Sequence, residues 1–256
     1  MRRSTDVPAS LFATRLADRL ARAKRRLRQS GHNRLCAQLS FANTYYLAFR
    51  DLPGIFRDHV EGRRALDFGC GTGRSTRFLR DLGFAVTGID IAPQMIAKAL
   101  EADPEGDYRL VQDDGLGEFS DAAFDLVLCA FPFDNIAGKL RLFSALRRLI
   151  APQGKIVNIV SSPALYRREW ASFSTRDFPE NRFAKPGDVV RIITTDFGDR
   201  RPAEDIFWPE ESYAGTYAAA GLNVLAVHKP LASGDESFAW VSETNTAPWI
   251  ITVLGR

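Results

Sequence analysis

From Arg63 onward, the apolar positions of the chain follow two different spacings. Short apolar runs bounded by glycine or charged residues are typical of strands, whereas apolar residues three and four apart are typical of helices. The strand pattern occurs at 63–68, 84–90, 108–112, 124–131 and 154–162. The helix pattern occurs between them, at 75–83, 93–103 and 139–150. Strands separated by helices of this length predict an α/β fold with a doubly wound, mostly parallel sheet.

Two of the predicted helices carry further detail. Pro93 suits the first turn of the helix over 93–103, because that position needs no backbone donor. In the helix over 139–150, Leu140, Phe143, Leu146 and Ile150 fall on one side, which predicts the side that packs on the sheet.

The stretch LDFGCGTGR, residues 66–74, places Gly69, Gly71 and Gly73 directly after the first predicted strand. Glycines at alternate positions allow a sharp turn and let main chain approach a ligand closely. Their spacing is G-x-G-x-G, which differs from the G-x-G-x-x-G of dinucleotide-binding folds. Asp67, just before the loop, repels a pyrophosphate and attracts an ammonium group. The loop therefore favours a nucleotide-like ligand carrying an ammonium group, with a purely structural turn as the alternative.

Acidic residues follow the next two predicted strands. Asp90 ends the second strand, where a carboxylate can accept hydrogen bonds from both ribose hydroxyls. A helix cap is the alternative role, but Pro93 puts the cap position at Ala92, which favours ribose binding. Asp113 and Asp114 follow the third strand. One of them can accept from an adenine amino group, while the other serves a turn.

The stretch from Ala65 to Ile136 resembles the class I S-adenosylmethionine-dependent methyltransferases. Four motifs in the family order carry the resemblance: LDFGCGTGR, GID, QDD and FDLVLCAF. The resemblance implies that the three glycines lie along S-adenosyl-L-methionine and that Asp67 serves its amino-acid end. It further implies that Asp90 holds the ribose, Ile91 packs on the adenine and Asp113 faces the adenine amino group.

The same resemblance implies a seven-stranded sheet whose last strand runs antiparallel. The segments NVLAVHKP at 223–230 and WIITVLGR at 249–256 look like the closing pair of strands. One departure from the family pattern is Ala92, where many relatives carry a capping serine, so this helix start is weaker here.

Substrate information lies outside the motifs. The aromatic-rich segment 41–56 predicts a helical lid. Tyr45 and Tyr46 are either core residues or, as the resemblance suggests for Tyr46, a cover for the cofactor. The loop after the fourth strand borders the transferred methyl group in relatives. Phe133 there is a candidate substrate contact, and Asp134 is a candidate for orienting or deprotonating the nucleophile.

An unusual insertion at about 163–208 follows the fifth predicted strand. Tyr166 and Trp170 in its first part are candidate substrate-binding residues. Segments 188–197 and 204–208 predict a β-hairpin. Such a hairpin either walls off a substrate pocket or forms a dimer surface, so a homodimer stays open. The long connection at 230–248 is of the kind that is often functional.

Charge is uneven along the chain. Residues 1–34 hold nine Arg and one Lys against two Asp, and leucines recur there at helical spacing. A helix docked by its leucines is one interpretation, and a nucleic-acid arm or a membrane-surface helix is the other. We therefore divide the chain into a basic helix and lid at 1–62 and a cofactor-binding domain at 63–256.

The composition of the chain argues against a disulfide-rich, metal-binding, membrane-spanning or secreted protein. The chain has 256 residues, 45% of them hydrophobic, which is enough for one large α/β domain. Three scattered cysteines and three unclustered histidines support neither a disulfide framework nor a metal site. No apolar run is long enough to span a bilayer, and the start lacks a secretory signal. These features predict a cytoplasmic protein.

The sequence predicts an S-adenosylmethionine-dependent methyltransferase that moves a methyl group to an oxygen, nitrogen or carbon of a small molecule. Aromatic residues in the lid and the insertion favour an enclosed pocket and hence a small substrate. The alternatives are a methyltransferase that acts on RNA or another macromolecule through the basic arm, and a protein that binds the cofactor without methylation.

Overall fold

The computed structural model describes residues 42–112, 116–131, 136–196 and 201–256 of the chain. Its main element is a seven-stranded sheet with the order β3-β2-β1-β4-β5-β10-β9. The strands are β1 (Arg64–Phe68), β2 (Ala85–Asp90), β3 (Asp107–Leu110), β4 (Phe124–Ala130), β5 (Ile150–Ser161), β9 (Asn223–His228) and β10 (Trp249–Gly255).

The sheet has the topology expected from the sequence. Neighbouring strands from β3 to β5 pair in parallel, and β10 pairs antiparallel with both β5 and β9. The strand order reverses between β1 and β4, so the carboxyl ends of β1, β2 and β4 meet at the edge where such sheets bind ligands. The predicted closing pair of strands is confirmed as β9 and β10.

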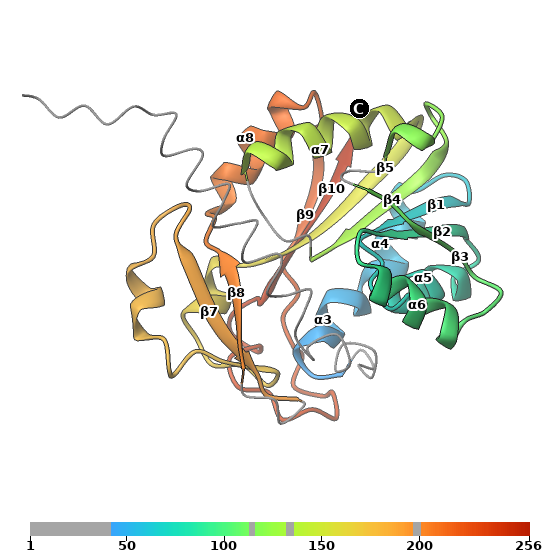
Figure 1. Cartoon of the computed structure of the whole chain (residues 1–256). Helices are drawn as coiled ribbons and strands as arrows, with labels where there is room; N and C mark the ends of the chain where they lie inside the picture. The colour runs from blue at the N-terminus through green and yellow to red at the C-terminus, as the bar shows by residue number, and fades with distance from the viewer. Residues whose placement is uncertain (1–41, 113–115, 132–135, 197–200) are drawn as a thin grey trace, which may run out of the picture.

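Helices cover both faces of this sheet (Figure 1). One face carries α3 (Thr44–Arg50), α4 (Leu52–His59), α5 (Arg74–Asp81) and α6 (Pro93–Ala102), and the other carries α7 (Ile136–Leu149) and α8 (Glu210–Ala219). Adjacent residues of a strand point to opposite faces. In β5, Val157 therefore joins the core under α3 and α4, while Ile156 joins the core under α7 and α8.

Two details of the helices differ from the sequence prediction. Leu140 is 41% exposed, whereas Phe143 and Leu146 are buried; Ile150, predicted as helical, is buried as the first residue of β5. The buried stripe of α7 is therefore shorter than predicted. No prediction covered α8, in which Thr216 and Tyr217 are buried. Ala92 is confirmed as the N-cap of α6, with no side-chain hydrogen bond.

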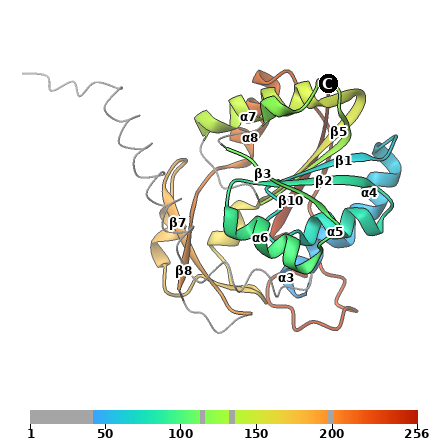
Figure 2. The same ribbon diagram turned by 45° about the vertical axis from the view of Figure 1, so that its right-hand side comes forward.

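The insertion after β5 forms a second, three-stranded sheet with the order β6-β7-β8 (Figure 2). Its strands are β6 (Phe173–Ser174), β7 (Val189–Thr194) and β8 (Pro202–Ile206), and two 3-10 turns precede β7: η2 (Pro163–Tyr166) and η3 (Pro179–Phe183). Strands β7 and β8 pair antiparallel, which confirms the predicted hairpin. A further 3-10 turn, η1 (Leu116–Glu118), connects β3 to β4.

A buried hydrogen-bond cluster fastens α3 to the insertion and to the connection before β10. Glu243 is fully buried, and its carboxylate accepts hydrogen bonds from the Thr44 hydroxyl at 2.6 Å and the Ala171 amide at 2.7 Å. Thr44 also bonds Ser172, and its carbonyl accepts from the Trp249 indole at 2.7 Å. Three segments far apart in the sequence thus meet at the first residue of α3.

No helix in the described parts of the chain is both long enough and apolar enough to cross a membrane.

Candidate cofactor and substrate site

The glycine loop connects β1 to α5 and leaves open space above two of its glycines. Gly69, Gly71 and Gly73 all have positive φ, at 75°, 55° and 75°. A Cβ atom added to Gly69 or Gly71 would meet nothing within 4 Å. A Cβ at Gly73 would stand 2.6 Å from the Tyr108 ring. The first two glycines therefore border open space, whereas the third makes room for a neighbouring side chain.

Asp90 lies beside this loop at the end of β2. Its carboxylate accepts hydrogen bonds from the Gly71 amide at 2.9 Å and from the Ala92 amide at 2.8 Å. The predicted helix cap is Ala92 rather than Asp90, which the structure confirms, but Asp90 also holds the loop and its own turn. Each carboxylate oxygen has a second lone pair, so Asp90 can still accept from ligand hydroxyls.

Asp67 is buried behind the loop with 1% exposure. One carboxylate oxygen accepts from the Ser75 hydroxyl at 2.7 Å and the Thr76 hydroxyl at 2.6 Å. The other, Oδ1, has no hydrogen-bond partner among the described residues. Burial raises the pKa of Asp67 to about 6, against the lowering effect of both hydroxyls, and the charge of Asp90 adds to the increase.

The structure describes only some of the residues expected to contact the adenine ring. Ile91, directly after Asp90, is 37% exposed, and Leu110 at the end of neighbouring β3 is 48% exposed. Both side chains are thus exposed apolar groups near the carboxyl ends of adjacent β2 and β3. Asp113 and Asp114 lie outside the described residues.

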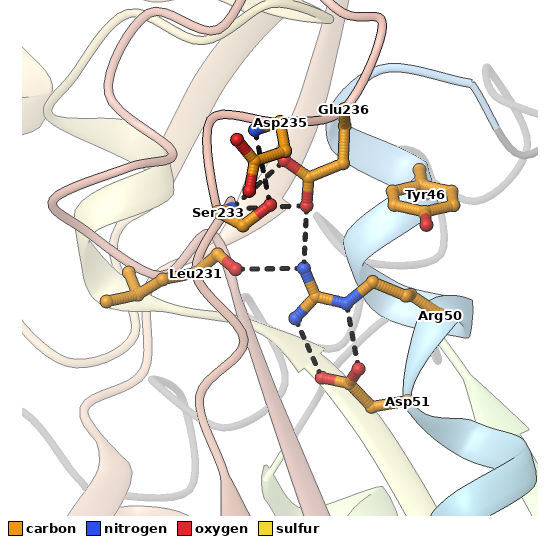
Figure 3. A pocket seen from close by; sticks show the side chains of 7 residues that line it. All are labelled: Tyr46, Arg50, Asp51, Leu231, Ser233, Asp235 and Glu236. Carbon is orange, nitrogen blue, oxygen red and sulfur yellow. Dashed lines mark hydrogen bonds and ion pairs between the residues drawn. The ribbon is translucent and has the colours of Figure 1, made fainter.

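Tyr45 and Tyr46 point to different places. The Arg74 guanidinium, at the first residue of α5, lies 5.7 Å from the Tyr45 ring centroid. Tyr46 instead packs on Phe238 at 5.3 Å and lines a cavity of about 660 Å³ (Figure 3). Tyr45 is therefore the tyrosine that contacts the end of the glycine loop, whereas Tyr46 is the one that the resemblance suggests as a cover for the cofactor.

The cavity beside Tyr46 is dominated by a saturated ion-pair cluster. Arg50 donates to Asp51, to Glu236 and to the Leu231 carbonyl (Figure 3). Burial disfavours ionisation of Glu236, but hydrogen bonds from Ser233, from backbone and from the Trp240 indole outweigh it and lower its pKa to about 2. Each of the three guanidinium nitrogens of Arg50 donates at least one hydrogen bond. This cluster therefore fastens α3 to the connection before β10.

Aromatic rings gather where β4 ends. Phe131 follows β4 with a φ of 56°, a conformation that is rare for a bulky residue, and its amide donates to the Ile159 carbonyl at 2.9 Å. Its ring lies 4.7 Å from Trp249 and 5.9 Å from Tyr45, and Tyr45 also contacts Phe173 at 5.2 Å. We call Tyr45, Phe131, Phe173 and Trp249 the aromatic cluster. The sequence reasoning missed Phe131, whose only signal was its place after β4.

The other residues predicted to contact the substrate are either buried or outside the described residues. Phe133 and Asp134 lie outside the described residues. Tyr166 is 4% exposed and donates its hydroxyl to Asp205. Trp170 is 3% exposed and its indole donates to the Leu165 carbonyl at 3.0 Å. Trp170 is therefore a satisfied core residue, and we do not retain it as a substrate contact.

A buried lysine that the sequence reasoning missed lies in the first turns of α7. Lys139 is 3% exposed, and its ammonium group lies 3.8 Å from the Tyr213 ring centroid and 5.4 Å from that of Trp208. The two rings stabilise this charge through cation–π contacts. A lone lysine in an amphipathic helix gives no such signal in the sequence.

Two other kinds of chemistry find no support in the described residues. They contain no group of three or more His, Cys, Asp or Glu side chains that could hold a metal ion. The Cys70 thiol lies close to the loop, but burial, Asp67 and Asp90 all raise its pKa. Cys70 is therefore a poor nucleophile at neutral pH.

Sequence comparisons agree with this geometry. A family profile described as "Methyltransferase domain" matches residues 66–158. The chain is 33% identical over 164 residues to 2-methyl-6-phytyl-1,4-hydroquinone methyltransferase of Synechocystis sp., an alignment that covers 63% of this chain and 46% of that protein. It is 27% identical over 202 residues to a ubiquinone biosynthesis O-methyltransferase of Idiomarina loihiensis, covering 69% and 80%.

Solved structures show the same fold. A SAM-dependent methyltransferase from Methanosarcina mazei aligns with a TM-score of 0.58 at 17% identity, over 78% of this chain and 95% of that one. The 1,6-didemethyltoxoflavin-N1-methyltransferase of Burkholderia thailandensis aligns with a TM-score of 0.52 at 15% identity, over 99% and 92%. Residues 66–158 thus match a methyltransferase domain, and the sheet order gives the chain the fold of the class I S-adenosylmethionine-dependent methyltransferases.

Proposed function

We propose that this protein binds S-adenosyl-L-methionine over Gly69 and Gly71 and transfers its methyl group to a small molecule. The observation that carries the proposal is the open space above these two glycines, with Asp90 and the unpartnered oxygen of Asp67 beside it. Residues of this kind at the ends of adjacent parallel strands suit a nucleoside ligand.

Asp90 would hold the ribose. Its carboxylate is already oriented by the Gly71 and Ala92 amides, so no side-chain rearrangement is needed to present the remaining lone pairs. Charge-assisted hydrogen bonds to a carboxylate are among the stronger polar contacts in proteins. The half-exposed Ile91 beside it would pack on the adenine ring.

Asp67 would serve the amino-acid end of the cofactor. A buried acceptor without a partner is costly, and an ammonium group supplies both the missing donor and the opposite charge. Gly73, by contrast, supports the site indirectly, by letting Tyr108 pack under the loop.

The bound cofactor supplies a methyl group that is already activated by its sulfonium. The chain therefore has to align the acceptor and exclude water. Tyr45, Phe131 and Trp249 suit the second task, because they place apolar rings at the end of β4 beside the residue that begins α5.

We propose a small aromatic molecule as the methyl acceptor. Tyr45 and Phe131 are both partly exposed, and planar rings stack favourably on such side chains. The Synechocystis and Idiomarina relatives are named for methyl transfer to a hydroquinone and in ubiquinone biosynthesis, respectively. Asp134 is kept as the proposed base, with Phe133 as a substrate contact and Asp113 and Asp114 as adenine contacts.

We also propose that Tyr46 contacts the cofactor and that Tyr166 contacts the substrate, both at the margin of the site. We further propose that residues 1–62 form the basic helix and lid, that residues 63–256 form the cofactor-binding domain, and that the protein is cytoplasmic.

The experiment is a turnover screen with purified full-length protein. It combines S-adenosylmethionine with hydroquinones, catechols and N-heteroaromatic compounds, with aliphatic amines and alcohols as the comparison set. Release of S-adenosylhomocysteine is followed by chromatography, and the methylated product by mass spectrometry. We expect product from the aromatic set only. Asp90→Ala serves as the variant with weakened cofactor binding.

Two outcomes would contradict parts of the proposal. Cofactor binding by calorimetry without product from any acceptor would favour a non-methylating binder, or a macromolecular acceptor. Absence of cofactor binding in folded protein would reject the assignment of the glycine loop.

A further inference from the structure

The insertion contains a second pocket, away from the glycine loop. Its volume is about 360 Å³, and its walls come from the end of η2 and the turn after it, the turn after β6, η3 itself and Ser242. The side chains that define its character are Arg167, Arg168, Glu169, Arg176, Phe178 and Arg182. Four guanidinium groups thus share one small space with a single carboxylate, which gives the lining a net charge of +3.

The carboxylate of Glu169 is bonded to groups of its own loop. Glu169 pairs with Arg176 at 3.2 Å and accepts from the Thr175 amide at 2.8 Å and the Thr175 hydroxyl at 3.0 Å. Burial opposes ionisation of Glu169, but these bonds and the charge of Arg176 outweigh it and lower its pKa. Glu169 therefore neutralises Arg176 and no other arginine of the pocket.

The other three arginines are not neutralised by side chains in the part of the chain that the structure describes. Arg167 lies over the Phe207 ring at 4.7 Å and donates to the Ala184 carbonyl. The side chains of Arg168 and Arg182 make no ion pair or hydrogen bond within these residues, although the Arg168 carbonyl accepts from the Thr175 hydroxyl at 3.2 Å. The nearby Glu180 is directed elsewhere, with its carboxylate 3.9 Å from Arg191.

Several arginines without a carboxylate partner that line one concave surface suit a multivalent anion. Each guanidinium can donate two parallel hydrogen bonds to a phosphate, and its charge cannot be removed by deprotonation. Phe178 and Pro179 add an apolar surface beside the cations. A dianionic group attached to a small organic body matches both the charge and the lining better than a single carboxylate does.

We propose that this pocket binds the phosphate group of a small phosphorylated ligand. Among the described residues, those that line the pocket form no hydrogen bond or ion pair with the glycine loop, Asp67 or Asp90, so the inference does not rest on the cofactor site. Tyr166 also lines the pocket and is shared with the proposed methyl transfer.

Isothermal titration calorimetry of the full-length protein with inorganic pyrophosphate tests the proposal. The test variant is Arg168→Ala/Arg182→Ala. The control is Arg57→Ala/Arg141→Ala, which removes the same charge from exposed positions on α4 and α7. We expect saturable binding, weakened about tenfold or more in the test variant and less than about twofold in the control. Circular dichroism and thermal unfolding verify that both variants fold.

Further titrations distinguish a phosphate ligand from other anions. Citrate replaces pyrophosphate in one arm and a short single-stranded RNA in another. Citrate binding without pyrophosphate binding, or RNA binding that is much tighter and equally sensitive to the test variant, would overturn the proposal. So would equal weakening in the control, because it would indicate general electrostatic attraction.

A last arm uses the Gly71→Val variant, in which the proposed cofactor site is blocked. Unchanged pyrophosphate binding there would support a separate phosphate site, whatever the outcome for methyl transfer. Loss of pyrophosphate binding in this variant would instead overturn the independence of the two sites.

Discussion

The glycine-loop edge and the buried hydrogen-bond cluster around Thr44 and Glu243, which we call the cap, are built from contacts of very different range. At the glycine loop, Asp67 bonds Ser75 and Thr76 across 8 and 9 residues, and Asp90 bonds Gly71 across 19. In the cap, Thr44 bonds Ser172 across 128 residues, Glu243 across 199 and Trp249 across 205.

This difference explains what each region can contribute. The glycine-loop site consists of one strand–loop–helix unit and the strand that follows it. Its geometry depends only on that unit, so the same kind of cofactor site can recur in many proteins. The cap exists only after the whole chain has folded, because its polar groups find partners in three remote segments. Substrate specificity is expected to reside in this cap.

The largest expected effect is on the stability of the cap. Glu243→Ala leaves the Thr44 hydroxyl and the Ala171, Val241 and Ser242 amides without their acceptor. We expect a loss of about 4 kcal/mol in the free energy of unfolding, because buried donors without partners are costly. Urea denaturation measures it. Glu243→Gln keeps one acceptor oxygen and should lose about half as much.

The same variant also tests whether the two regions are separable. Cofactor affinity of folded Glu243→Gln protein should stay within about threefold of wild type, since Asp67, Gly71 and Asp90 keep their local bonds. A large loss of cofactor affinity in Glu243→Gln would contradict the idea that the glycine loop and the cap are separable. So would a loss of less than about 1 kcal/mol in the free energy of unfolding of Glu243→Ala.

The next effect is on the glycine loop. Gly71→Val places a branched side chain in the open space above the loop, and we expect cofactor affinity to fall by about 3 kcal/mol, a factor of about 100. Gly83→Val is the matched control, because Gly83 also has a positive φ of 87° and open space around it but follows α5. Both variants should lose similar stability, and only the first should lose affinity in calorimetry.

A third variant of the loop sharpens this test. Gly73→Ala should mainly lower stability, because its Cβ overlaps Tyr108 rather than ligand space. Equal losses of affinity in the Gly71 and Gly83 variants would show that backbone strain, and not the proposed cofactor, explains the result.

Asp90→Ala should weaken S-adenosylmethionine binding by about 2 kcal/mol, because two hydroxyls lose a charged acceptor and the loop loses an anchor. Asp107→Ala is the control, since Asp107 lies at the other end of adjacent β3 and bonds Thr87 and Arg109. Calorimetry on both folded variants compares them. Unchanged affinity in Asp90→Ala would remove the ribose assignment.

The smallest expected effect is a pH dependence. The pKa of Asp67 is about 6 in the fold, against 3.8 ordinarily, and a cofactor ammonium favours its ionised form. Affinity for S-adenosylhomocysteine should therefore rise about tenfold from pH 5 to pH 7 and then level off. Before any ligand binds, Asp67 opposes folding increasingly as pH rises from about 4 through 6. Asp67→Asn should show neither trend; if it keeps the affinity trend, another group is responsible.

Much of the cofactor site could be predicted because its signals are local. The strand–glycine–helix pattern, Asp90 at the next strand end and the order of the motifs all lie within a short stretch of chain. The insertion hairpin and the closing strands β9 and β10 were also predicted from their apolar runs. Helix α8 was missed because Gly215 and its alanines leave only Thr216 and Tyr217 buried, which is too little for a visible stripe.

The sequence by itself therefore determined the sheet, the glycine loop and the acidic strand ends, since each depends on neighbours within one or two elements. Only the tertiary structure decided that Tyr45 rather than Tyr46 contacts Arg74, because adjacent residues of a helix point about 100° apart and the phase is set by packing. It likewise decided that Trp170 is core and that Glu243 joins three segments. Burial and long-range hydrogen bonds depend on partners that no local pattern identifies.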